Sequence, residues 1–331
     1  EEARRPEGST QLGEQTMATV LAVLTSGRRS GFTSQLLADA AAGAGSIDGV
    51  DVDTLHTHDF SFGPCTSCFA CVREPQSACV LEDDMGRRGS GELYRPIADA
   101  NALLIGDPVH NWSPSASARL LIERCYPFLW NGALKGMPSA AISCASNQGM
   151  HRLARRELCK WLFGLRTRYV GGIAAHVARF DQARQQAREL GAALGRAAVA
   201  DEREGRRAWD DPECFGYYVQ HAPWDPLDCY LENLTDGTLD PDASVMVKAL
   251  DTQAFDNARA RELLEQAQEG LARTLQLYQT GDRVSAARAL ADASAYWTHA
   301  TWLEFLQEEV IGTRQPETYR ALPQSGDGAE Q

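Results

Sequence analysis

Short apolar runs alternate with helix-like segments along the first two hundred residues, and this alternation is the strongest constraint on the fold. The runs that read as strands are Ala18–Thr25, Val50–Leu55, the end of Ile97–Gly106, Met137–Ser143 and Tyr169–Ile173. Helical segments follow at Gln35–Ala42, after Ser115, at Leu153–Phe163 and at Gln182–Ala198. Strands that alternate with helices form parallel sheets covered on both faces. We therefore expect an α/β fold, a doubly wound five-stranded parallel sheet over residues 17–200.

Polar loops follow three of these strands. They are Ser26–Thr33, Asp107–Ser115 and Ser143–Gly149. In parallel α/β sheets, ligands bind beyond the carboxyl ends of the strands, where such loops meet. We expect the three loops to form one ligand site.

The first loop, Ser26–Thr33, has the composition of an anion site. It reads Ser-Gly-Arg-Arg-Ser-Gly-Phe-Thr and lies between a strand and a helix start. Backbone N–H groups at a helix N-terminus attract anions, and hydroxyl groups add donors. The loop lacks the Gly-Lys-Ser/Thr ending of a P-loop and is not G-x-G-x-x-G. From these residues alone, a phosphate site and an ordinary strand–helix loop both remain open.

The segment between the second and third strands, residues 62–85, carries a cluster of cysteines. Four of the nine cysteines, Cys65, Cys68, Cys71 and Cys79, are spaced C-x2-C-x2-C-x7-C. Such close thiolates suit the corners of a 4Fe–4S cluster. Structural zinc more often uses two Cys or Cys/His pairs that are a dozen or more residues apart. The spacing favours a cluster, with zinc and unligated or redox-active thiols as alternatives.

Composition limits the possible partners. The net charge is −13 and no basic stretch offsets it, which argues against nucleic-acid binding. No apolar run approaches the length of a membrane span, and no signal-peptide pattern is present. With an odd number of cysteines, these features predict a cytoplasmic protein. Residues 1–16 are polar and are expected to be a disordered tail.

Four features together resemble the flavodoxin-like NAD(P)H-dependent FMN reductases and, within them, the iron–sulfur flavoproteins. They are the loop Ser26–Thr33, the cysteine motif followed by Asp83-Asp84-Met85, Asp107-Pro-Val-His110 leading into Ser115-Ala116, and the glycine-bearing loop after the fourth strand. The similarity extends from about Ala18 to Ala198. It implies a flavodoxin-like fold and FMN as a cofactor.

The resemblance also implies roles for individual residues. The FMN phosphate would be held by Ser26, Arg28, Ser30 and Thr33. The isoalloxazine would be lined by Pro108, Val109, His110, Asn111, Trp112 and Ser115, and on its other edge by Cys144, Ala145, Ser146, Asn147 and Gly149. The four clustered cysteines would bind a 4Fe–4S cluster. His110 stands where relatives often have Tyr, and it would either line the pocket or act as a catalytic proton donor.

The function implied is that of an FMN-dependent oxidoreductase linked to NAD(P)H or ferredoxin. Its acceptor would be a small-molecule substrate or a redox partner protein, and the chain would form a homodimer or homotetramer. Two alternatives remain: a clusterless FMN-dependent reductase or tailoring enzyme, and a non-enzymatic electron carrier.

Residues 201–331 lie outside the resemblance and are expected to form a helical addition. A charged linker starts at Asp201, and the aromatic segment Trp209–Tyr230 reads as a lid, an interface or a packed tail. Phe255–Tyr278 and Val284–Val310 have the apolar spacing of an αα-hairpin. We expect this addition to bury or shape the flavin site, directly or across a homo-oligomer interface.

Overall fold

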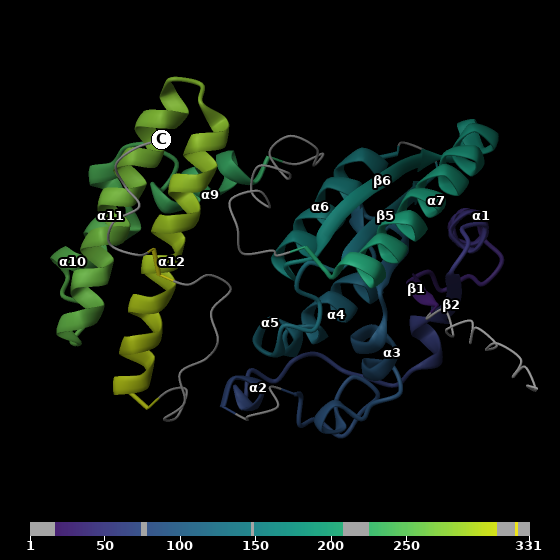
Figure 1. The fold of residues 1–331 in the computed structure, drawn as a ribbon, viewed down its shortest axis with the longest axis horizontal. Helices are drawn as coiled ribbons and strands as arrows, with labels where there is room; N and C mark the ends of the chain where they lie inside the picture. Colours follow the sequence, from purple (N-terminus) through teal and green to yellow (C-terminus); the bar gives the residue numbers. More distant parts are fainter. Residues whose placement is uncertain (1–16, 74–77, 147–148, 208–224, 310–321, 324–331) are drawn as a thin grey trace, which may run out of the picture.

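A twisted parallel sheet forms the centre of the first part of the chain (Figure 1). The computed structural model describes residues 17–73, 78–146, 149–207, 225–309 and 322–323. The parallel strands are β1 (Ala18–Leu24), β2 (Val50–His56), β3 (Ala102–His110), β5 (Pro138–Ala145) and β6 (Arg168–His176), in the order β2-β1-β3-β5-β6. The short β4 (Ser113–Pro114) pairs antiparallel with β3. This is the strand order of flavodoxin-like folds, and the predicted fold class is confirmed.

Helices cover both faces of the sheet. On one face lie α1 (Phe32–Gly45) and α7 (Phe180–Glu204), and on the other α3 (Tyr94–Asp99), α4 (Ala116–Arg124) and α6 (His151–Gly164). Strand β1 shows the division, because successive side chains point to opposite faces. Leu21 and Val23 belong to the core of the second face, whereas Val20 and Ala22 belong to that of the first.

The helices α1 and α7 approach each other backbone to backbone. A Cβ atom at Gly191 would lie 1.8 Å from the Ala40 carbonyl oxygen, and one at Gly43 would lie 2.1 Å from the Arg188 carbonyl oxygen. Neither position has room for a side chain. The two glycines therefore set the spacing of the helices on this face.

At two of the wrongly predicted boundaries, the structure shows the physical reason. Asp107–His110 was expected to be loop, but β3 continues through it. Pro108 is tolerated because β1 pairs with β3 only as far as Gly106, so the missing N–H leaves no bond to β1 unmade. The linker does not start at Asp201, because α7 runs to Glu204 and the buried Asp201 pairs with Arg168 at 2.7 Å.

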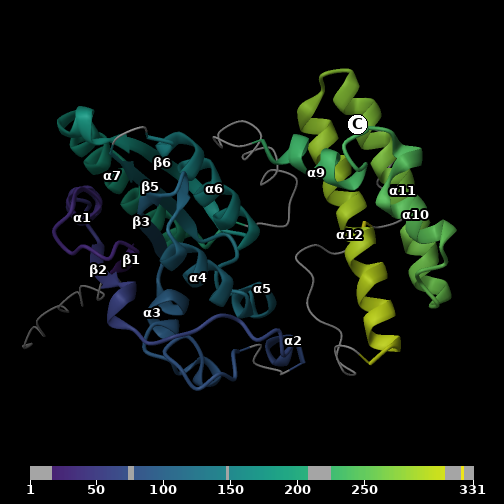
Figure 2. The same cartoon turned by 180° about the vertical axis from the view of Figure 1, so that it is seen from behind.

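The C-terminal region is helical, as expected. It comprises α9 (Pro226–Leu234), α10 (Val245–Asp251), α11 (Ala258–Gln279) and α12 (Arg283–Gln307). Two views show α11 and α12 side by side as a hairpin (Figure 1 and Figure 2). The shorter α9 and α10 were not predicted. The predicted tail, residues 1–16, and most of the aromatic segment, residues 208–224, lie outside the described residues. No helix in the described ranges has the length and apolar character to cross a bilayer.

Two ring contacts between described residues join the helical region to the sheet domain. On α9, Tyr230 packs against Phe163 with ring centroids 6.2 Å apart. On α12, Trp302 meets Trp130 of α5 (Pro127–Asn131) edge to face at 4.9 Å. The same apolar cluster includes Val72 of the short helix α2 (Ala70–Arg73). The far end of the hairpin is thus packed beside the cysteine segment.

The α1–α7 contact gives a first prediction. Gly191→Ala should lower the free energy of unfolding by about 1–3 kcal/mol, because the methyl group must push two helix backbones apart. Gly164→Ala is the matched control, since a Cβ there meets no atom of the described residues within 4 Å. It should change stability by less than about 0.5 kcal/mol. Urea unfolding measures both, and equal effects would contradict the close approach.

Candidate functional site

The first loop leaves the N-terminus of α1 open. Gly31 is the N-cap of α1, and among the described residues no side chain caps the first-turn N–H groups. The Ser26 hydroxyl accepts a hydrogen bond from the Arg28 backbone N–H at 3.2 Å, which curls the loop. A cavity of about 440 Å³ lies in front, lined by residues 28–32 and Gln35. Open backbone donors, a hydroxyl and a guanidinium around a hollow make an anion site.

His56 supports this loop from the neighbouring strand. Its ring Nε2 hydrogen-bonds to the Ser26 carbonyl oxygen. His58 stacks on it with ring centroids 5.1 Å apart and hydrogen-bonds to the Ser117 hydroxyl at 3.1 Å. Sequence reasoning missed both histidines, because their role depends on β2 lying next to β1.

Asp107 joins the first loop to the second. Its side chain is fully buried and accepts hydrogen bonds from the Thr25 hydroxyl, the Ser115 backbone N–H at 2.9 Å and the Ser115 hydroxyl at 2.5 Å. Burial raises the pKa of Asp107, and these donors oppose the shift. Ser115 is also the N-cap of α4. One carboxylate therefore connects the ends of β1 and β3 to the start of α4.

The second loop is a tight hairpin at the edge of the sheet. Asn111 and Trp112 have φ values of 48° and 69°, and they turn β3 into β4. Pro108 is buried, Val109 is half-buried and His110 is exposed. The Trp112 side chain is 60% exposed at the tip. This hairpin presents an aromatic ring beside the carboxyl ends of the strands.

The third loop follows β5. Cys144 and Ala145 are the last residues of that strand, not loop residues as expected, whereas Ser146 is exposed. Burial raises the pKa of Cys144, and the neighbouring Thr33 side chain of α1 opposes this shift, so the first and third loops lie close together here. Gly149 adopts a φ of 94°, which favours glycine. Asn147 lies outside the described residues.

Large apolar side chains are exposed around this edge. Phe32, Trp112, Met150 and Leu153 are between 37% and 60% exposed. They come from the starts of α1 and α6 and from the β3–β4 turn. Such side chains around polar loops are typical of a binding site.

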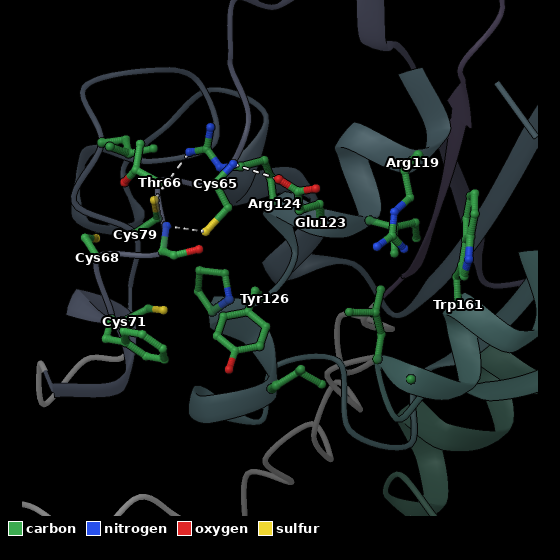
Figure 3. A pocket seen from close by; sticks show the side chains of 18 of the residues that line it. Cys65, Thr66, Cys68, Cys71, Cys79, Arg119, Glu123, Arg124, Tyr126 and Trp161 are labelled. Atoms are coloured by element: carbon green, nitrogen blue, oxygen red, sulfur yellow. Dashed lines mark hydrogen bonds between the residues drawn. The ribbon is translucent and has the colours of Figure 1, made fainter. Parts of the chain in front are cut away.

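The four clustered cysteines line a second cavity of about 680 Å³ (Figure 3). Cys65 and Cys68 are exposed, and Cys71 and Cys79 are half-buried. Burial and the neighbouring thiols raise the pKa of Cys71 to about 12. Among the described residues, no three His, Cys, Asp or Glu side chains are arranged as ligands of a single metal ion.

Arg124, at the end of α4, fixes the cysteine segment. Its buried guanidinium donates two hydrogen bonds to the Asp83 carboxylate, at 2.6 and 2.8 Å, and one to the Gly63 carbonyl at 2.6 Å. It also lies 3.3 Å from the Cys79 sulfur. Glu123 accepts a hydrogen bond from the Cys65 N–H at 2.8 Å. Two adjacent residues of α4 therefore hold both ends of the cysteine motif. Sequence reasoning missed Arg124 and Glu123.

The predicted residues thus fall into two groups. The first surrounds the carboxyl edge of the sheet: Ser26, Arg28, Ser30, Thr33, Pro108, Val109, His110, Asn111, Trp112, Ser115, Cys144, Ala145, Ser146 and Gly149. The second is the four cysteines. The predicted roles of these residues stay predictions.

Comparison with known proteins identifies the first part of the chain. Residues 18–182 match the family described as NADPH-dependent FMN reductase. An iron-sulfur flavoprotein of Archaeoglobus fulgidus is 29% identical over 120 residues, 36% of this chain and 51% of that protein. One of Methanocaldococcus jannaschii is 24% identical over 129 residues, 39% of this chain and 63% of that protein. The chain therefore covers less than two thirds of either relative.

Solved structures show weaker similarity. A flavone reductase aligns with a TM-score of 0.42 and 14% identity, over 56% of this chain and 65% of that one. The flavodoxin of Megasphaera elsdenii aligns with a TM-score of 0.35 and 16% identity, over 54% of this chain and 98% of that one. The fold assignment rests on the strand order instead.

The Asp83–Arg124 pair gives a pH-dependent prediction. Burial alone would raise the pKa of Asp83, but Arg124 outweighs it and holds that pKa below its ordinary value of 3.8. A lowered folded-state pKa stabilises the protein above the unfolded-state pKa, and this stabilisation is lost as the pH falls through the folded-state value. Asp83→Asn should therefore cost about 3 kcal/mol at neutral pH. The difference in the free energy of unfolding between this variant and the unmodified chain should shrink below about pH 4.

Glu82→Gln is the control, because Glu82 is the exposed carboxylate next to Asp83. It should change stability by less than about 0.5 kcal/mol at any pH. Denaturant unfolding between neutral pH and about pH 3 measures both variants. A cost for Asp83→Asn that does not vary with pH would show that Arg124 does not depend on the charge of Asp83.

Proposed function

Because residues 18–182 place the chain in the NADPH-dependent FMN reductase family, we propose that it is an FMN-dependent oxidoreductase of the iron–sulfur flavoprotein type. Electrons pass between a reduced donor, either NAD(P)H or ferredoxin, and a small-molecule or protein acceptor. FMN supplies two-electron chemistry that can be divided into single-electron steps, and a 4Fe–4S cluster supplies one-electron transfer.

The open N-terminus of α1 is the observation that carries the FMN proposal. It offers uncapped N–H groups behind a cavity at the carboxyl edge of the sheet. Arg28 and Ser30 line this cavity, Ser26 precedes them in the loop, and Thr33 lies in the first turn of α1. In this proposal these four residues would hold the phosphate. A dianionic phosphate would satisfy donors that no side chain caps.

The exposed apolar side chains support binding of a ring system beside this anion site. Phe32 and Trp112 stand on the first and second loops, and Met150 follows the third. An isoalloxazine would lie between the Pro108–Trp112 hairpin and the Cys144–Gly149 loop. We also propose that the chain forms a homodimer or homotetramer, in which a second copy covers the remaining exposed apolar surface.

The cysteine cavity supports the proposal of a 4Fe–4S cluster. All four cysteines line one cavity, and the Arg124 cation lies next to Cys79. A 4Fe–4S cluster takes four cysteine thiolates as ligands, one on each iron. The names of the archaeal relatives point the same way.

A clusterless FMN-dependent reductase is the second candidate. The observation in its favour is that Cys65 and Cys68 are exposed. Iron and sulfide analysis of anaerobically purified protein separates the two candidates. Absorbance at about 400 nm beyond the flavin bands accompanies a cluster.

The anion site predicts that FMN binds more tightly than riboflavin. Each charge-assisted contact to the phosphate contributes roughly 1.5–3 kcal/mol. The ratio of dissociation constants should therefore be roughly tenfold to a hundredfold or more. Arg28→Gln should reduce this ratio, as measured by flavin fluorescence quenching. The control is Arg196→Gln, because Arg196 is an exposed cation of α7 that does not line this cavity. Equal affinities for the two flavins would refute the phosphate site.

The cluster proposal predicts the effect of removing single thiols. Changing Cys65, Cys68, Cys71 or Cys79 to Ser should remove most iron and sulfide but leave FMN bound, because the flavin loops lie at the other end of α4. Cys229→Ser is the control, since Cys229 is a half-buried cysteine on α9 that does not line the cavity. Metal analysis and the flavin spectrum measure both properties. Iron retained in all four variants would refute this ligand set.

A further inference from the structure

The cysteine cavity extends well beyond the cysteines. We propose that its other end, lined by Arg119, Lys160 and Trp161, binds the acidic group of a planar aromatic substrate. This inference rests on the proposed oxidoreductase function and names its substrate class. These three side chains belong neither to the flavin loops nor to the proposed cysteine ligands.

The dimensions of the cavity suit a small organic molecule. Its volume of about 680 Å³ lies within the roughly 300–1,000 Å³ of typical small-molecule sites. Figure 3 shows the cysteines at one end, Arg119 and Trp161 at the other, and Tyr126 between them. Ile122, Leu129 and Leu165 complete an apolar wall. A mainly apolar cavity with a few charged groups is the usual form of a ligand pocket.

Two cations at this end lack carboxylate partners. Within the described parts of the chain, neither Arg119 nor Lys160 forms an ion pair, and both are exposed. Glu123, one turn after Arg119, already accepts the Cys65 N–H and forms no ion pair with Arg119 among the described contacts. In a chain of net charge −13, two such cations on one apolar cavity favour an anionic ligand.

Aromatic side chains give the cavity a preference for flat molecules. The Arg119 guanidinium lies 5.3 Å from the centre of the Trp161 ring, which holds the charge in place against an aromatic face. Tyr126 contributes a second ring, and Phe69 a third that is 39% exposed. Rings pack against rings by offset stacking or edge-to-face contact. A planar aromatic acid satisfies both the rings and the cations.

The position of this end suits a substrate of the proposed reaction. Ser115 caps the N-terminus of helix α4 beside the flavin loops, and helix α6 starts after the third loop. Arg119 lies one turn into α4, and Trp161 lies near the end of α6. The site therefore lies between the two helices that lead from the flavin edge to the cysteine cavity.

The test uses two probes that share their ring systems. The anion 8-anilinonaphthalene-1-sulfonate is compared with neutral N-phenyl-1-naphthylamine, which lacks the sulfonate. Equilibrium dialysis of the full chain at saturating FMN measures both dissociation constants, so that the flavin loops are occupied. We expect the anion to bind roughly tenfold more tightly or better.

Single-residue variants test whether the preference for the anionic probe arises in this cavity. Arg119→Gln and Lys160→Gln should each reduce the preference for the anion without weakening the neutral probe, and Arg119→Lys should retain it. Trp161→Leu should weaken both probes. The control Arg156→Gln removes an exposed cation of α6 that does not line the cavity, and it should change neither constant.

Two results would overturn the inference: equal affinities for the two probes, or an anion preference that persists in Arg119→Gln and Lys160→Gln. Flavin and iron are measured in the same samples. A chain that binds FMN but shows no anion preference refutes the site alone. A chain that binds no FMN refutes the proposed function, whatever the probes show.

Discussion

The buried carboxylate of Asp107 is the interaction on which the ligand-binding edge depends. A parallel sheet brings the carboxyl ends of its strands to one edge, but it does not fix the loops that follow them. Asp107 does so by accepting hydrogen bonds from Thr25, after β1, and from Ser115, which caps α4. No cation is paired with it among the described residues, and burial raises its pKa. A buried carboxylate destabilises the fold unless it is hydrogen-bonded, so Asp107 must keep its donors. Because these donors belong to both loops, the same hydrogen bonds hold the two loops together.

The sheet could be predicted from the sequence because its strands are buried on both faces. Val20 to Leu24 are apolar without interruption, and a short run of this kind between helix-like segments indicates a buried parallel strand. The extension of β3 through Pro108 could not be predicted, since a proline in a strand is tolerated only where the neighbouring strand has ended. Similarly, the charged sequence around Asp201 reads as a linker until its partner Arg168, on β6, is known.

The candidate site also contains some residues that could be predicted from the sequence and others that could not. Residues adjacent in sequence, such as the cysteines and the Ser26–Thr33 loop, form patterns that can be recognised. The residues that position them cannot, because they come from distant segments. Arg124 meets Asp83 across 41 residues, and His56 meets Ser26 across 30. Arg119 and Trp161 read as ordinary residues of helical faces, and their relation to the cysteines becomes apparent only in the packed structure.

Helix α4 connects the two halves of the site. Ser115 caps it at the Asp107 carboxylate, Arg119 faces the cavity one turn later, and Arg124 at its end binds Asp83 beside Cys79. Its 9 residues span about 14 Å at 1.5 Å per residue. A single rigid helix therefore sets the separation of the flavin loops from the cysteines, and any ligand bound at Arg119 lies beside that helix, between its two ends. The C-terminal hairpin packs against the far side of the cysteine segment through Trp302. The C-terminal helices are thus placed to stabilise the cysteine segment from the far side, while α4 holds it from the near side.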